Sequence, residues 1–145
     1  MINFDAVGLK GTPFDLDVER GKIAEFAEAV RATHPSHFFR DGSTIPPTFL
    51  STTLAWDKRV EGANPWGRVQ MSEERGMHAE QEYIFHGPPP QAGARLTCEH
   101  RIDSINEKTS RSGTTLTFVK MVTEFRDEAG TLVAESILTG VERGE

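Results

Sequence analysis

The first third of the chain carries apolar side chains at helical spacing. Within residues 18–32 they follow the i, i+3, i+4, i+7 pattern of one helix face: Ile23, Phe26, Ala27 and Val30. Pro35 ends this helix, because a proline disfavours helical backbone in the residue before it. The pattern predicts an amphipathic helix over residues 18–32 and, after it, a loop that contains two histidines.

A second helix is predicted over residues 45–56. It begins with two prolines, which suit a first helical turn because their missing N–H groups are not needed there. Four side chains then share a face: Phe49, Leu50, Thr53 and Leu54. Residues 57–76 are mostly polar and contain glycine and proline, which predicts a long loop of the kind that is usually functional or mobile.

From residue 76 onward the pattern changes to alternation. Four β-rich stretches, joined by short turns, cover residues 76–86, 94–109, 113–128 and 131–141. In the second stretch Leu96, Cys98 and Ile102 share one face, and Cys98 is expected to be a buried apolar position. Two helices followed by four such strands predict an α+β domain, in which a long antiparallel meander wraps around a helix and buries its apolar face.

Length and composition set the scale of the protein. The chain has 145 residues, of which 37% are hydrophobic and 26% charged, as in a single globular domain spanning residues 1–145. The net charge is −6 and the 16 basic residues are scattered, which argues against nucleic-acid binding. Net charge does not exclude a local basic pocket for a phosphate-bearing ligand.

Cysteine content and the chain's first residues indicate the compartment. Cys98 is the only cysteine, so the sequence predicts neither a disulfide framework nor a zinc site. The first residues lack the basic and apolar regions of a signal peptide, and no segment approaches the length of a membrane span. We therefore expect a cytoplasmic protein.

The order of several motifs resembles a known family. IPPTF is followed by EQEY and a histidine, then by AGARL and two long strands, GTTLTFVKMVTEFRDEAGTLVAES. Together they resemble the N-terminal-type hot-dog domain of MaoC-like dehydratases and (R)-specific enoyl-CoA hydratases, from about Val7 to Val141. The resemblance implies a single hot-dog fold, with a long antiparallel sheet around a central helix at residues 47–56, and no cofactor. It also implies pairing, as a homodimer or with a second hot-dog subunit, and an acyl-CoA or acyl-carrier-protein thioester at the interface.

The loop RATHPSHFF lies where catalytic members of this family carry D-x-N-P-x-H. That aspartate and histidine hold the water that adds to an enoyl thioester, one acting as base and one as acid. Pro35 and His37 match the motif, His34 stands in place of the asparagine, and Ala32 stands in place of the aspartate. A methyl group can neither accept a proton nor orient water, so half of the catalytic pair is missing.

Three interpretations of His37 follow. It could act as the catalytic residue with a carboxylate from elsewhere, such as Glu28 or Asp41, although a displaced carboxylate has to recover accurate geometry. The chain could instead be the non-catalytic half of a heterodimer whose partner carries the pair. In the third interpretation, His34 and His37 only cap the end of the helix. A metal site is not predicted, because the two histidines have no third ligand.

The resemblance also suggests substrate-binding residues. Pro47, Thr48, Phe49 and Leu50 begin the central helix, whose N–H groups could polarise a thioester carbonyl; the alternative is a core helix with no contact to substrate. Packing is the expected role of Phe49 and Leu50, with an acyl channel as the other. His86, at the end of a strand, is a further candidate, although an exposed histidine would be ordinary there.

The basic residues around the long loop complete the set of candidates. Arg59, Arg68 and Arg75 could meet coenzyme phosphates, although solvated surface positions are the default.

These observations predict a subunit of a hydro-lyase in fatty acid metabolism: an enoyl-thioester hydratase or 3-hydroxyacyl-thioester dehydratase. The chain would supply the acyl-binding half to a catalytic partner. The alternatives are a self-sufficient homodimeric hydratase that uses His37, a non-catalytic module that binds acyl thioesters, and an acyl-CoA thioesterase. The thioesterase needs a carboxylate on the central helix, and residues 47–56 contain none, the nearest being Asp57.

Overall fold

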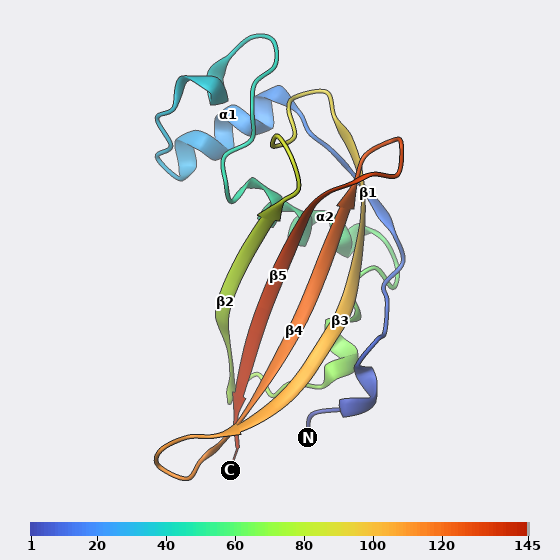
Figure 1. Ribbon diagram of the computed structural model, residues 1–145, viewed down its shortest axis with the longest axis vertical. Coiled ribbons are helices and arrows are strands. Elements are labelled where there is room, and N and C mark those ends of the chain that lie inside the picture. The colour runs from blue at the N-terminus through green and yellow to red at the C-terminus, as the bar shows by residue number, and fades with distance from the viewer. Residues whose placement is uncertain (145) are drawn as a thin grey trace.

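The protein is built on one five-stranded antiparallel sheet. The computed structural model describes residues 1–144, and Figure 1 shows the strands curving side by side along its long axis. The strands are β1 (Phe14–Asp17), β2 (Gly76–Phe85), β3 (Arg95–Thr109), β4 (Thr115–Arg126) and β5 (Leu132–Arg143). Their order across the sheet is β1-β3-β4-β5-β2, so β1 and β2 form its two edges.

One face of the sheet forms the main hydrophobic core. On β3 the inward positions Leu96, Cys98 and Ile102 are buried, which confirms the predicted face; Leu96 and Cys98 belong to this core and Ile102 to a second hydrophobic cluster. Burial raises the pKa of the Cys98 thiol to about 12, with a smaller contribution from the nearby charge of Asp15. Cys98 is therefore an uncharged core residue at neutral pH, and the predicted α+β architecture is confirmed.

The central helix is shorter than the sequence predicted. In place of one helix over residues 45–56, the chain forms a 3-10 helix η3 (Phe49–Thr52), the α-helix α2 (Thr53–Trp56) and a second 3-10 helix η4 (Asp57–Arg59). The Thr53 hydroxyl donates to the carbonyl of Leu50 at 2.8 Å, competing with regular helical bonding. The hydroxyl-bearing run at residues 51–53 has low helix propensity, which favours these short turns.

The first helix is also shorter than predicted. Helix α1 runs over Arg20–Ala29, and Arg31 beyond it has a left-handed backbone with φ of 57°. The N–H of Ala32 donates to the carbonyl of Ala27 at 2.8 Å, and the N–H of Arg31 to that of Glu28 at 3.1 Å. These two bonds form a Schellman motif. The helix therefore ends before Pro35 can act on it.

The long loop is more ordered than predicted. Residues 57–76 contain η4 and another 3-10 helix, η5 (Pro65–Val69). The loop's end is tied to β5, because Glu142 accepts from the N–H of Ser72 at 2.6 Å and pairs with Arg75 at 3.3 Å. Burial would raise the pKa of Glu142, but these bonds outweigh it and lower the pKa.

Candidate functional site

The loop after α1 holds His37 in a fixed orientation. Residues Pro35–Phe38 form the 3-10 helix η2, and His37 is only 7% exposed. Its Nδ1 lies 2.7 Å from the carbonyl oxygen of Thr44. Because a carbonyl can only accept, Nδ1 carries a hydrogen, and Nε2 is the ring nitrogen left to act as a base. The loop is anchored in turn by the N–H of Ile45, which donates to the carbonyl of Pro90 at 3.3 Å.

No acidic partner is joined to this histidine. Within residues 1–144, no hydrogen bond or ion pair links His37 to a carboxylate, and Glu28 and Asp41 are both exposed. Its aromatic neighbours are His34, at 5.9 Å between ring centroids, and Phe38, at 6.5 Å. His37 is therefore positioned as a base would be, but without the second group of an acid–base pair.

His34 has a local structural role. Its Nδ1 lies 2.7 Å from the Ser36 hydroxyl and accepts from the Ser36 N–H at 3.3 Å, so it caps the start of η2 rather than the end of α1. Ala32 is held by the Schellman motif that ends α1. Neither side chain supplies a carboxylate to the loop.

The predicted substrate-binding residues divide into buried and exposed pairs. Phe49 and Leu50 are fully buried in the main core, and Phe26 of α1 meets Phe49 edge-on at 5.5 Å. Pro47 and Thr48 are exposed just before η3. The structure thus brings Phe49 and Leu50 together as core residues, at the start of the helical segment that faces the sheet.

A narrow slot separates this helical segment from the β2 edge of the sheet. Its lining includes Ser51 and Leu54 from the helical segment, with Gln81 and Tyr83 from β2. Burial raises the pKa of Tyr83, although a hydrogen bond with Ser51 acts in the opposite sense. The slot holds only about 10 Å³. This volume is barely enough for one water molecule, so an acyl chain requires the slot to open.

A larger apolar pocket adjoins the slot at Leu138. It has a volume of about 280 Å³ and lies between the loop that contains η5 and strands β2 and β5. Trp66, Met71 and Met77 contribute to its walls. A β-carbon at Gly140 would lie 2.8 Å from the Trp66 ring, so glycine is required for this close approach.

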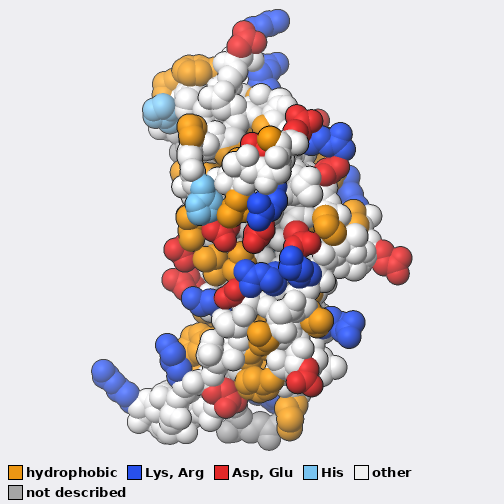
Figure 2. Space-filling view, turned by 45° about the vertical axis from the view of Figure 1, so that its right-hand side comes forward, with side chains coloured by type: hydrophobic (Ala, Val, Ile, Leu, Met, Phe, Trp, Pro, Cys, Tyr) orange, Lys and Arg blue, Asp and Glu red, His pale blue; other side chains and the backbone are white. Residues whose placement is uncertain are grey.

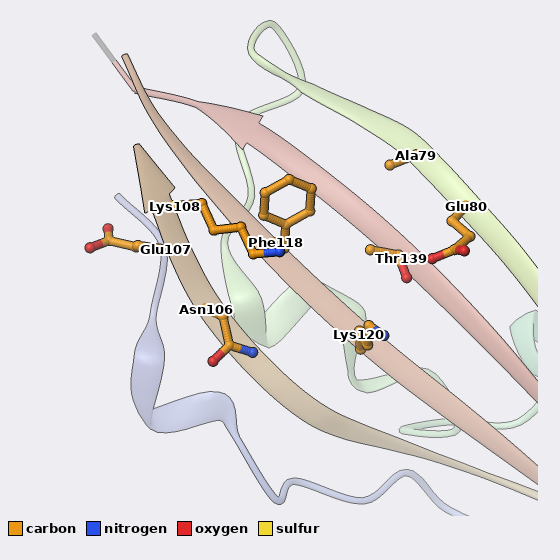
Figure 3. Close-up of a pocket in the computed structure, with 8 residues that line it drawn as sticks. All are labelled: Ala79, Glu80, Asn106, Glu107, Lys108, Phe118, Lys120 and Thr139. Atoms are coloured by element: carbon orange, nitrogen blue, oxygen red, sulfur yellow. The ribbon is translucent and has the colours of Figure 1, made fainter. Parts of the chain in front are cut away.

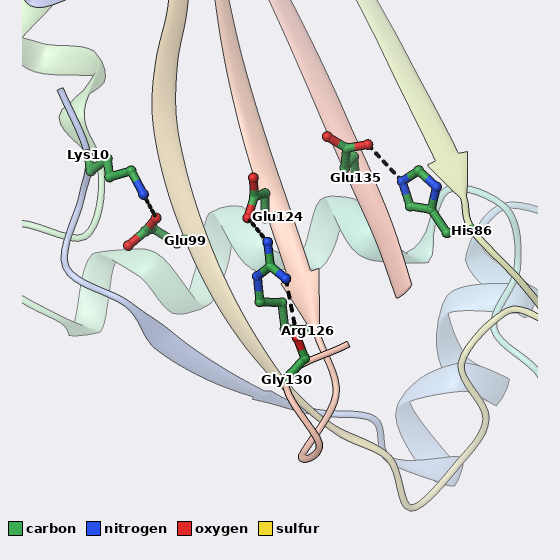
Figure 4. Close-up of polar contacts among 7 residues, drawn as sticks. All are labelled: Lys10, His86, Glu99, Glu124, Arg126, Gly130 and Glu135. Atoms are coloured by element: carbon green, nitrogen blue, oxygen red, sulfur yellow. Dashed lines mark hydrogen bonds and ion pairs between the residues drawn. The ribbon is translucent and has the colours of Figure 1, made fainter. Parts of the chain in front are cut away.

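His86 lies on the opposite face of the sheet. Its Nε2 is 2.7 Å from Glu135, as Figure 4 shows. Glu135 lies between Ala134 and Ser136, whose side chains face the core, so Glu135 points to the outer face. Among residues 1–144, no hydrogen bond, ion pair or ring contact joins His86 to His37 or to residues 47–50.

The arginines proposed for coenzyme phosphates have other neighbours. The Arg59 guanidinium lies over the Trp56 ring at 4.4 Å, and Arg75 pairs with Glu142. Arg68 is exposed. In residues 1–144 no group of three or more metal-ligating side chains occurs, and none of the helices is long and apolar enough to cross a membrane.

A buried polar network escaped the sequence analysis. His100 on β3 and Asp57 in η4 are both almost completely buried, with His100 Nε2 3.2 Å from Asp57 Oδ2. The other ring nitrogen is 2.7 Å from the Thr123 hydroxyl, and Asn64 Nδ2 donates to Asp57 Oδ2 at 2.8 Å. The available signal was the alternation itself, because His100 occupies an inward position between Cys98 and Ile102.

The network also determines whether the Asp57 carboxylate is available for chemistry. Burial lowers the pKa of His100, with attraction to Asp57 acting in the opposite sense, so the imidazole is neutral at pH 7. Asp57 faces this imidazole and Asn64 in the interior. Both bonds go to Oδ2, which fixes η4 against β3, whereas Oδ1 is buried without a hydrogen-bond partner in residues 1–144. Because Asp57 is only 1% exposed, the carboxylate is not open to solvent.

Comparison with known proteins gives a family match over most of the chain. Residues 5–136 match the family described as "FAS1-like, dehydratase domain region". A relative from Saccharopolyspora erythraea, called a UPF0336 protein, is 32% identical over 102 residues, which cover 63% of this chain and 62% of that relative. The chain thus spans somewhat less than two thirds of the relative's length.

Two solved structures share the fold over 94% of this chain. The C-terminally truncated HadBC (3R-hydroxyacyl-ACP dehydratase) complex of Mycobacterium tuberculosis has a chain 25% identical, with a TM-score of 0.69 and 97% of that chain covered. A MaoC-like dehydratase is 26% identical with a TM-score of 0.74, and 42% of it is covered. Together with likeness to a hot-dog-like protein from Thermanaerovibrio acidaminovorans, these matches confirm the expected hot-dog fold.

Proposed function

Because the chain belongs to the FAS1-like dehydratase-domain family and has the MaoC-like hot-dog fold, we propose that it is a subunit of an enoyl-thioester hydratase or 3-hydroxyacyl-thioester dehydratase. It supplies the acyl-binding half, and a second hot-dog subunit supplies the catalytic pair. The whole chain, residues 1–145, forms a single such domain. Its substrate is an acyl chain on coenzyme A or acyl carrier protein, and its compartment is the cytoplasm.

One observation carries this proposal. His37 is buried and oriented by Thr44, but the catalytic loop has Ala32 where the family pattern has an aspartate, and no carboxylate is joined to His37 in residues 1–144. Hydration needs both a base for the attacking water and an acid for the α-carbon. A single imidazole lacks the second group, whereas a partner with the complete loop has both.

The β2 edge supports assembly with a second hot-dog subunit. The N–H of His86 donates to the carbonyl of Val133 on β5. Along an antiparallel strand, successive residues direct their backbone N–H and C=O groups alternately toward and away from the paired strand. Since His86 directs its N–H toward β5, the backbone groups of Gln81, Tyr83 and Phe85 point to the unpaired edge. On the adjoining helix α2, Leu54 is 42% exposed beside Gln81 and Tyr83. A partner at this edge would satisfy the backbone groups and cover the apolar side chain.

The same surface leads to the proposed acyl site. We assign the acyl chain to the slot beside Tyr83, opened by the partner, and to the adjoining 280 Å³ apolar pocket. Pro47 and Thr48 would face the thioester end, while Phe49 and Leu50 support it from the core. His86 faces the outer side of the sheet, away from this acyl site. It would therefore contact a ligand only if the ligand were bound by another subunit of the assembly.

A second candidate function is a self-sufficient homodimeric hydratase. It is favoured by the orientation of His37. The hydrogen bond from Nδ1 to the Thr44 carbonyl places a hydrogen on Nδ1, which leaves Nε2 to act as a general base. A thioesterase has less support, because Asp57, the carboxylate nearest to the central helix, is only 1% exposed and its Oδ2 is bonded to His100 and Asn64.

Replacing His37 with alanine separates the first two functions. In the assembled hydratase we expect His37→Ala to lower kcat by less than about fivefold, since a catalytic general base contributes roughly 10²–10⁴-fold. The measurement is crotonyl-CoA hydration by the complex, with His34→Ala as the matched histidine control. A loss of 10²-fold or more in His37→Ala alone would assign catalysis to this chain.

A further inference from the structure

A long groove crosses the outer face of the sheet, on the side away from α2. It has a volume of about 730 Å³ and runs across all four long strands near the end where the termini lie. Figure 3 shows the side chains that line it: Ala79, Glu80, Asn106, Glu107, Lys108, Phe118, Lys120 and Thr139. None of these residues belongs to the loop or the slot discussed above.

Two lysines bring positive charge into the groove. The Lys108 ammonium lies 5.4 Å from the centre of the Phe118 ring, which holds it over the groove instead of extended into water. Lys120 has no hydrogen bond or ion pair within residues 1–144. Two other basic side chains of the outer face are paired: Lys10 with Glu99, and Arg126 with Glu124 (Figure 4). Figure 2 shows such acidic and basic side chains next to one another across the middle of the molecule.

A buried hydroxyl without a partner lies between the strands that carry these charges. Thr139 is only 4% exposed, and its Oγ1 has no hydrogen-bond partner in the described chain. It lines the groove and is in register with Lys120 on β4 and Glu80 on β2. Buried polar groups are nearly always satisfied, so this hydroxyl lacks a partner that a ligand seated deep in the groove would supply.

The spacing of the two lysines suits an elongated anion. Lys120 pairs with Thr139, whereas Lys108 pairs with Leu116, four residues away along β4. Four residues of strand span about 13 Å between these two register positions. The Lys108 ammonium, however, lies over Phe118, which is two residues, or about 7 Å, from Lys120 along β4. The amide of Asn106, which is in register with Phe118, adds a neutral donor between them.

We propose that this groove binds the diphosphate group of a soluble ligand. Lys120 and the Thr139 hydroxyl hold one phosphate, and Lys108 and Asn106 hold the other. Charged donors with oxyanions form the stronger class of hydrogen bond, and the hydroxyl gains the partner that it lacks. Glu80 opposes the anion from the β2 side, while Glu107 accepts from the Thr117 hydroxyl and points away from the other side chains (Figure 3).

The test is titration of the full chain with inorganic pyrophosphate and with inorganic phosphate, by isothermal calorimetry at fixed ionic strength. We expect pyrophosphate to bind about tenfold more tightly than phosphate, because it engages both lysines. Lys120→Gln should weaken pyrophosphate binding about tenfold and Thr139→Val about fivefold. Glu80→Gln should strengthen it about threefold, because the variant removes a repelling charge.

Two controls separate loss of the site from a general loss of positive charge and from loss of folding. Lys10→Gln removes the same charge from the paired Lys10 and should leave pyrophosphate binding unchanged. Thr139→Val should fold with undiminished thermal stability, because it removes an unsatisfied hydroxyl and keeps the β-branched shape. The proposal is overturned if pyrophosphate does not bind, if Lys10→Gln and Lys120→Gln weaken it equally, or if Thr139→Val binds as tightly as the unaltered chain.

Discussion

Replacing His100 with alanine is expected to destabilise the protein by about 3–5 kcal/mol. Loss of a large buried side chain leaves a cavity, and loss of one member of a buried polar pair leaves the other without compensation. Here the stranded groups are the Asp57 carboxylate and the Thr123 hydroxyl, both buried beside His100. Urea unfolding followed by circular dichroism measures the change as a shift in the midpoint at constant slope.

His86 provides the matched control for this experiment. It also pairs with a carboxylate, Glu135, but on the exposed outer face, and exposed pairs contribute about 0–1 kcal/mol. We therefore expect His86→Ala to change the free energy of unfolding by less than about 1 kcal/mol. Equal losses in the two variants would contradict the structural role assigned to the His100 network.

Placing a charge on α2 with Leu54→Glu is expected to abolish assembly with the partner while the chain itself still folds. Leu54 is 42% exposed in the single chain, so glutamate can extend into water there. In the assembled hydratase that side chain would be buried against the partner, where an unpaired charge is costly. Central interface residues contribute about 2–4 kcal/mol, which corresponds to a loss of about 30- to 1,000-fold in affinity.

Val7→Glu is the control for this interface. Val7 is 48% exposed and lies at the other side of the sheet, next to Gly8, whose N–H donates to the carbonyl of Ile102 on β3. We expect it to assemble as the unaltered chain does, by size-exclusion chromatography with light scattering. Normal assembly of Leu54→Glu would show that the partner does not bind at the β2 edge.

The strands were predictable because their patterns are long. Alternation over ten or more residues identified β2 to β5, and the inward face of β3 followed from Leu96, Cys98 and Ile102. Strand β1 (Phe14–Asp17) was missed because four residues give too short an alternation to separate from a loop.

The helices were placed correctly but their lengths were not. Local backbone geometry decides where a helix ends, and periodicity does not report it. The left-handed Arg31 ends α1, and the hydroxyls of residues 51–53 favour short turns near α2. The side-chain pattern predicts where these helices lie. Their boundaries are determined by hydrogen bonds of single residues, which the pattern does not report.

The candidate site was predictable only in part. The loop with His37 and Ala32 could be identified by its motif, but its anchor at Thr44 could not, because that bond depends on how the loop folds. The pairing of Asp57 with His100 joins residues 43 positions apart, and no local pattern reports such a contact. A histidine on an otherwise apolar strand face was the one sign that the core contains a polar network.

Enoyl-thioester hydration by separate and combined subunits tests whether this chain needs a catalytic partner. Crotonyl-CoA hydration is measured with this chain alone, with a second hot-dog protein that carries D-x-N-P-x-H, and with both together. We expect no hydration by this chain alone and a rate for the mixture at least about 100-fold above either protein, since a complete acid–base pair contributes on that scale. Hydration by this chain alone that is lost in His37→Ala would show instead that the chain is a self-sufficient hydratase.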